Sequence, residues 1–196
     1  MSPAGNSQPE WRSRLDGVPD LACLEFVVRC ARRVQPMFLA AWPAAPQRLY
    51  QLLDGAIETV EEITTGRERT TSTFAFNGMS AVKAATKAGE PRAAAVASTV
   101  TCATYALTAI GYGDLTSTHA SQAAEYALEA FGGESDEEQQ AHAMLAAAMS
   151  SDLEAIHAGM AAGTVGEGPV PPGLLGPLWP DDEPALGFRV TLHDCD

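Results

Sequence analysis

Residues 20–41 of the chain read DLACLEFVVRCARRVQPMFLAA, and their apolar pattern sets the fold class. Apolar residues recur every three or four positions, as one face of an α-helix requires, and charged residues fall between them. The apolar set is Leu21, Leu24, Val28, Ala31, Val34, Phe38 and Ala41. We expect an amphipathic helix with Asp20 as its N-cap. Pro36 lacks a backbone N–H, so it should kink this helix or divide it.

Similar patterns downstream predict further helices. A second apolar stripe covers 49–63, and Gly66 follows it as a helix end. A third helix is expected over 74–88, closing at Gly89. Pro91 then opens a fourth helix at its first position, where the missing N–H costs nothing.

Two more signals mark helix ends in the second half of the chain. The strings YALTAIG (105–111) and YALEAFG (126–132) resemble each other, and each ends on a glycine suited to a left-handed cap. We therefore expect two successive helices to stop alike, unless the likeness is chance. Ser135 and Glu138 form a capping-box pattern that starts a last long helix.

Composition supports an all-α fold. The chain is 46% hydrophobic but only 7% aromatic, and its many alanines suit closely packed helices better than a sheet. We predict a flexible leader over 1–18 and a bundle of about six helices over 19–162. A Gly/Pro-rich extended arm over 163–196 should pack on the bundle. The alternation over 187–193 is compatible with one short terminal strand.

The cysteines point to a reducing compartment. Cys23, Cys30, Cys102 and Cys195 show neither a C-x-x-C pair nor a small secreted framework, so we expect packed, reduced thiols. Residues 1–14 lack the basic start and apolar run of a secretory signal. We therefore predict a cytoplasmic protein.

All of the net negative charge lies in the last 78 residues. Residues 1–118 hold 11 acidic and 11 basic side chains, whereas 119–196 hold 14 acidic side chains and Arg189. Such a half repels nucleic acid and anionic membranes. We predict instead a protein partner with a basic surface, and a homo-oligomer remains open.

The partner-binding residues that we predict are acidic: Glu134, Asp136, Glu137, Glu138, Asp181, Asp182 and Glu183. The first four also have a structural explanation, because negative residues in a first helical turn complement the helix dipole. Both roles can hold together.

Motifs for chemistry are weak. Residues 108–114, TAIGYGD, look like the selectivity filter of potassium channels, but no pair of apolar membrane spans flanks them, so a turn is expected. Glu154 and His157 form a single E-x-x-H, whereas a di-iron bundle needs two. Nucleotide-binding and hydrolase motifs are missing from the sequence. We therefore predict no catalytic residue, no cofactor and no metal site.

A small basic patch lies within the first predicted helix. Arg29, Arg32 and Arg33 have no interleaved aromatic residues, which argues against nucleic acid. We expect these arginines to pair with Glu25 or with the glutamates on the outer face of the second helix.

One family resemblance involves the same helix. The string Cys30-Ala31-Arg32-Arg33-Val34-Gln35-Pro36-Met37-Phe38 resembles the opening helix of the Imm5-like family of bacterial immunity proteins, the antidotes of polymorphic toxin systems. The likeness extends loosely over 21–131. The family's later alanine-rich helix carries histidines that Thr99 to Thr104 replace here, so no site is carried over. The resemblance implies an all-α protein that blocks a toxin by occlusion.

Three functions follow as hypotheses. The first is an immunity or antidote-like protein that captures a basic partner through an acidic surface, with an association rate that falls as salt rises. The second is a helical adaptor or regulatory subunit of a bacterial defence or signalling system, whose arm over 163–196 reaches a neighbour. The third is a metal-dependent helical enzyme that uses Glu154 and His157.

Overall fold

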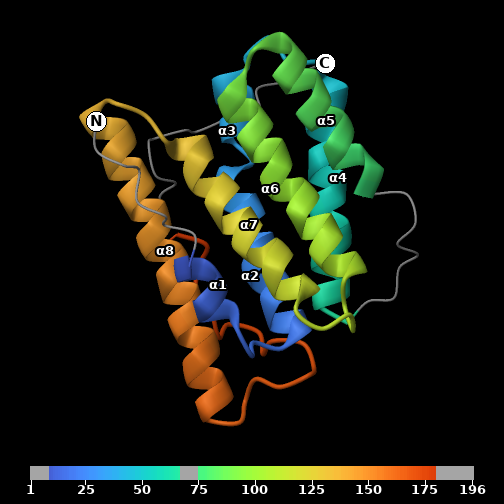
Figure 1. The fold of residues 1–196 in the computed structure, drawn as a ribbon, viewed down its shortest axis with the longest axis vertical. Helices are drawn as coiled ribbons and strands as arrows, with labels where there is room; N and C mark the ends of the chain where they lie inside the picture. The colour runs from blue at the N-terminus through green and yellow to red at the C-terminus, as the bar shows by residue number, and fades with distance from the viewer. Residues whose placement is uncertain (1–8, 67–74, 180–196) are drawn as a thin grey trace.

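The computed structural model describes residues 9–66 and 75–179, and this part of the chain is all α-helical. The predicted fold class is confirmed, and the helices form a bundle along the long axis of the molecule (Figure 1). The described residues contain eight helices: α1 (Pro9–Leu15), α2 (Asp20–Val34), α3 (Met37–Ala41), α4 (Gln47–Thr64), α5 (Ala75–Ala88), α6 (Pro91–Thr108), α7 (Leu115–Phe131) and α8 (Asp136–Ala161).

The alanine-rich helix α6 lies at the centre, against α2, α3, α4, α5 and α7. Most of its residues are buried, because alanine and threonine side chains let neighbouring backbones approach closely. Gly78 of α5 lets the α5 and α6 backbones approach closely: a Cβ there would lie 3.2 Å from the Cα of Thr101. The predicted start of α6 at Pro91 is confirmed.

Two differences raise the helix count above six. Pro36 divides the first predicted helix into α2 and α3, one of the two outcomes that we expected. The leader is the second difference: the prediction was wrong over 9–15, which form α1, while residues 1–8 lie outside the described residues. Trp11 and Leu15 lie one helical turn apart and are both buried, and the Trp11 ring lies 6.2 Å from that of Phe26.

Asp20 does not cap α2. It is the first residue of the helix, and Pro19 occupies the N-cap position. Its carboxylate instead accepts a hydrogen bond of 2.7 Å from the backbone N–H of Gly111. This bond ties the start of α2 to the turn between α6 and α7. Gly111 and Gly113 have positive φ in that turn, as the turn interpretation of the TAIGYGD string requires.

Not all of the glycines predicted to end helices have the left-handed conformation of a cap. Gly66 and Gly89 follow α4 and α5 with positive φ, as predicted. Gly132, at the end of α7, is extended, with φ −61° and ψ 138°. Helices α6 and α7 therefore do not stop alike, and the expectation drawn from the two similar strings was wrong.

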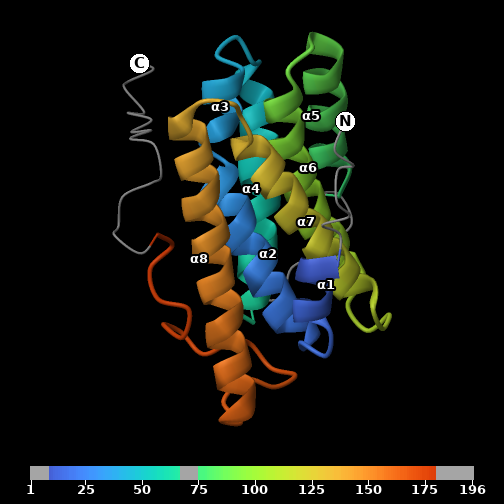
Figure 2. The ribbon, with the colours of Figure 1, turned by 60° about the vertical axis from the view of Figure 1, so that its left-hand side comes forward.

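The first part of the arm folds back from the end of α8 along the bundle (Figure 2). Over 163–179 it has no helix or strand, and Val165 and Trp179 are buried in the core. Gly159 of α8 admits the arm closely, since a Cβ there would collide with Val165. The predicted packing is confirmed as far as Trp179. The strand predicted over 187–193 lies outside the described residues.

Candidate partner-binding surfaces

The predicted acidic run lies at the start of α8. Ser135 and Glu138 exchange hydrogen bonds of 3.2 Å, so the capping box is confirmed. An Oε1–Nη2 contact of 2.7 Å also pairs Glu138 with Arg92. Bonding to Ser135 and then to Arg92 holds the pKa of Glu138 below its usual value. This residue is therefore committed to local structure.

The other predicted partner-binding residues fall into two groups. Glu134, Asp136 and Glu137 are exposed to solvent at the start of α8. The remaining three, Asp181 to Glu183, lie outside the described residues. Whether both groups border one surface stays a prediction.

A second acidic surface lies where α2, the C-terminal half of α4 and the arm meet. Two hollows of about 370 and 430 Å³ adjoin there and share Thr65. We call them together the acidic cleft. Its lining comprises Glu25, Arg29, Glu58, Glu61, Glu62, Thr64, Thr65 and arm residues 169–173, 175 and 176.

Helical spacing explains how α4 supplies its share of the cleft. Glu58, Glu61, Glu62 and Thr65 are spaced by three, one and three residues, so they fall on one face. That face borders α2, from which Arg32 reaches across. Arg32 makes two bonds of 2.6 Å to Glu61 and one of 2.7 Å to Asp54, as the sequence led us to expect for this arginine.

Glu25 is the innermost carboxylate of the cleft. Burial raises its pKa, while the hydroxyl of Thr64 and the charge of Arg29 act in the opposite direction. The charge on this side chain therefore has an energetic cost in the folded protein. Glu25 was predicted only as a partner for the arginines of α2, and its place in a cleft was missed.

Asp152 of α8 organises the arm. Its carboxylate bonds Arg29 at 3.1 Å and Arg33 at 2.5 Å, with both Arg33 and Asp152 buried. For Arg33 the expected pairing with Glu25 or α4 was wrong, whereas Arg29 bonds Asp152 and its charge also acts on Glu25. The sequence did indicate that Asp152 is buried, because it falls three residues after Met149 and next to Leu153, on the apolar stripe of α8.

The remaining N–H groups of the two arginines hold the arm. Arg29 donates to the carbonyl oxygens of Leu175, Gly176 and Pro177 at 3.2, 3.3 and 2.6 Å, and Arg33 donates to that of Leu178 at 2.8 Å. The Trp179 ring stacks over Arg33, 5.8 Å from its guanidinium carbon. A planar guanidinium with five donors suits such a clamp. The arm thus forms a fixed wall of the acidic cleft.

A third surface runs along α7, and we call it the tyrosine face. Leu115, His119, Gln122, Tyr126 and Glu129 form its stripe. Two hollows of about 310 Å³ lie beside this stripe, and Tyr126 and Glu129 line both. The exposed side chains of Tyr105 and Tyr112, the latter 72% exposed, continue the face from α6 into the α6–α7 turn.

The residues considered for metal and thiol chemistry do not form a site. His157 Nε2 lies 2.7 Å from the carbonyl oxygen of Arg14, and Glu154 is exposed. Within 9–66 and 75–179, no three His, Cys, Asp or Glu side chains gather as metal ligands. Cys23, Cys30 and Cys102 are buried and free, as predicted, and burial raises each pKa to about 12, while Cys195 lies outside the described residues.

Comparisons with protein families, with curated proteins and with solved structures find no match. Among the helices described, none is long and apolar enough to cross a membrane.

Proposed function

We propose that this protein captures a partner with a basic surface and blocks it by occlusion, in the manner of an immunity protein. The docking surface is the acidic cleft between α2, α4 and the arm. One observation carries the proposal: glutamates from two helices, 33 to 37 residues apart in sequence, line two adjoining hollows that share Thr65, and the arm forms a wall of the one that contains Glu25.

The chemistry of the cleft suits the cationic side chains of a protein partner. Glu25 and Glu58 accept hydrogen bonds from a guanidinium or an ammonium group, and the hydroxyls of Thr64 and Thr65 lie beside them. An incoming cation would offset the part of the cost of charging Glu25 that Thr64 and Arg29 leave uncompensated in the free protein. The net charge of −13 would steer such a partner toward the protein and raise the association rate.

The immunity class is supported by the resemblance of residues 30–38, and an occluding role fits a protein whose features are surfaces rather than a catalytic centre. An adaptor that reaches out with residues 163–179 is less favoured, because Arg29 and Arg33 hold this described part of the arm against its own bundle. The metal-dependent enzyme is disfavoured by the hydrogen-bonding distance between His157 and the Arg14 carbonyl.

Binding of a nona-arginine peptide, followed by calorimetry, tests the docking surface. The double variant Glu25→Gln/Glu58→Gln should weaken binding about tenfold at low salt, and raising the salt should weaken binding to the unmodified protein. The matched control Glu134→Gln/Glu137→Gln removes the same charge at the start of α8 and should change affinity less than about twofold.

The outcomes separate three cases. Equal losses of peptide affinity in both variants would indicate that docking involves the start of α8 or the whole acidic surface. No loss in either would remove the acidic docking surface altogether. For the immunity class itself, the test is co-expression with a toxin encoded beside this gene: the unmodified protein should restore the growth of cells that the toxin arrests, and the Glu25→Gln/Glu58→Gln variant should fail to do so.

A further inference from the structure

The tyrosine face has the spacing of a helix-pairing surface. Its stripe on α7, from Leu115 through His119, Gln122 and Tyr126 to Glu129, alternates steps of four and three residues. This is the spacing by which one helix presents a continuous seam to another. Leu115, Gln122, Tyr126 and Glu129 are exposed, and the half-buried His119 ring lies 5.5 Å from that of Tyr105 on α6.

The shape of the face is complementary to itself. Tyr126 and Glu129 line the hollow between α1 and α7 as well as the one beside α5 and α6, so they form a ridge flanked by two depressions. When such a surface meets a copy of itself about a two-fold axis, each ridge can enter a depression of the other copy.

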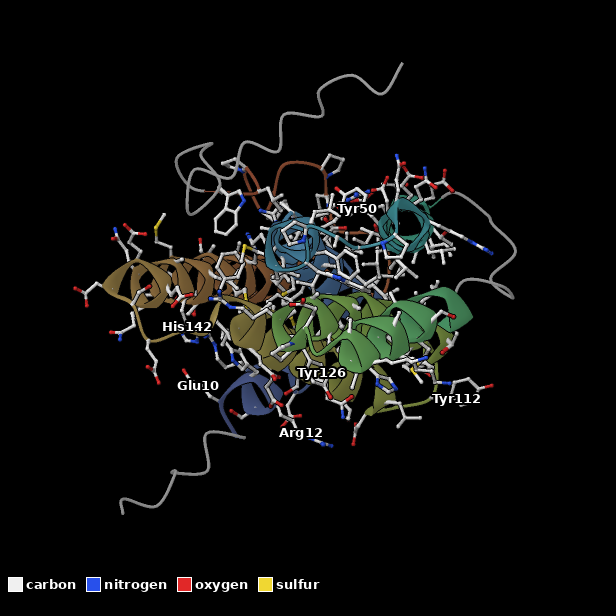
Figure 3. The ribbon with its side chains drawn as sticks, turned by 90° about the horizontal axis from the view of Figure 1, so that it is seen from above. Glu10, Arg12, Tyr50, Tyr112, Tyr126 and His142 are labelled. Atoms are coloured by element: carbon white, nitrogen blue, oxygen red, sulfur yellow. The ribbon has the colours of Figure 1, made fainter. Side chains whose placement is uncertain are left out.

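The charge of the face is also complementary to itself, unlike that of the acidic cleft. The hollow between α1 and α7 contains Arg12 together with Glu125 and Glu129. Arg12 and Tyr126 lie on the same side of the bundle, and Tyr50 lies on the opposite side (Figure 3). A two-fold interface places each residue type on both sides, so it needs both signs of charge in one patch.

We propose that a second copy of this chain docks on the tyrosine face. Helix α7 packs antiparallel to α7 of the other copy about a two-fold axis near Gln122, and Tyr126 of each copy enters the hollow beside Arg12 of the other. Arg12 then faces the carboxylates of Glu125 and Glu129 across the interface. Tyrosine-rich patches with a polar rim are typical of protein interfaces.

Sedimentation equilibrium on the full chain tests the dimer. The unmodified protein should approach twice its monomer mass within a concentration series reaching about 1 mM. Arg12→Glu and Glu125→Lys/Glu129→Lys should each raise the dimer dissociation constant at least tenfold, because like charges would then face each other. Mixing these two variants should restore dimers, since the opposite charges face each other again.

Circular dichroism of each variant checks that helix content is kept, and Glu58→Gln in the acidic cleft is the matched control that should leave the mass unchanged. A monomeric mass for the unmodified protein at every concentration would overturn the proposal. So would a dimer that neither charge variant weakens, or two weakened variants that fail to dimerise when mixed. None of these results depends on the peptide binding proposed for the cleft.

Discussion

The acidic cleft and the tyrosine face differ in the charges that they gather. In the cleft, carboxylates from α2 and α4 dominate. The two nearest arginines are already bonded: Arg29 to Asp152 and the arm, and Arg32 to Asp54 and Glu61. The tyrosine face instead combines Arg12 with Glu125 and Glu129 around exposed aromatic rings. A surface on which carboxylates outnumber a single arginine that is already bonded repels its own copy and selects a different molecule, whereas a surface with an available charge of each sign can bind itself. The two surfaces should therefore respond differently to the same perturbations.

The largest effect is expected from Asp152→Ala, which should damage the cleft and spare the tyrosine face. Removing this buried carboxylate leaves Arg29 and Arg33 without their partner, at a cost of about 3–5 kcal/mol in the free energy of unfolding. Urea denaturation measures the loss. The arm should also become accessible to proteases, and peptide binding should weaken because the cleft loses a wall.

Glu154→Ala is the matched control for that variant, on the exposed face of the same helix, and should change stability by less than about 0.5 kcal/mol. Equal stability of the two variants would show that the clamp does not hold the arm. A change in dimer mass in folded Asp152→Ala would show that the two surfaces are coupled.

A smaller effect is expected from Ser135→Ala at the start of α8. The variant loses the side-chain bond to the Glu138 N–H, and unfolding free energy should fall by about 1 kcal/mol. Peptide affinity and dimer mass should both stay unchanged, because this cap belongs to neither surface. A loss of peptide affinity larger than that of the cleft variant would instead support the docking surface predicted from the sequence.

The smallest effect is a gain in stability from Glu25→Gln, below about 1 kcal/mol at neutral pH. Burial raises the folded-state pKa of Glu25, so the folded protein binds this proton more tightly than the unfolded chain. The unmodified protein therefore loses stability as pH rises from the ordinary glutamate pKa through the raised value. Glutamine does not titrate and escapes that loss.

Thermal unfolding of both proteins between pH 3 and pH 8 measures this difference, which should vanish at the acid end. A constant difference across the whole range would mean that the charge of Glu25 is not the cause. The same variant should bind the arginine peptide less well, so stability and binding should move in opposite directions.

Local sequence patterns were enough to predict most of the fold. Pro36, Pro91 and the Ser135–Glu138 pair act on backbone within a few residues, and each took effect where expected. Helix α1 was missed because its polar residues hide the single apolar pair Trp11 and Leu15, and its seven residues, about two turns, are too few for periodicity to be visible.

The surfaces were harder to predict, because they depend on residues brought together from distant parts of the chain. Asp152 lies 119 residues from Arg33, and Glu25 meets α4 only after the two helices pack. The acidic run of 134–138, by contrast, is contiguous and easily noticed, yet its Glu138 serves the helix end. The contiguous acidic run therefore belongs in part to a helix cap, whereas the residues of the cleft come together only when the helices pack.

The most direct test of the central claim is to titrate isotope-labelled protein with the nona-arginine peptide and to map the amide chemical shifts by NMR. We expect the changes to gather around Glu25, along 58–65 and, in the arm, at Val170 and over 173–176, and to disappear at high salt. Changes gathered at 134–138, or spread evenly over the acidic residues, would contradict the claim that the cleft is the docking surface.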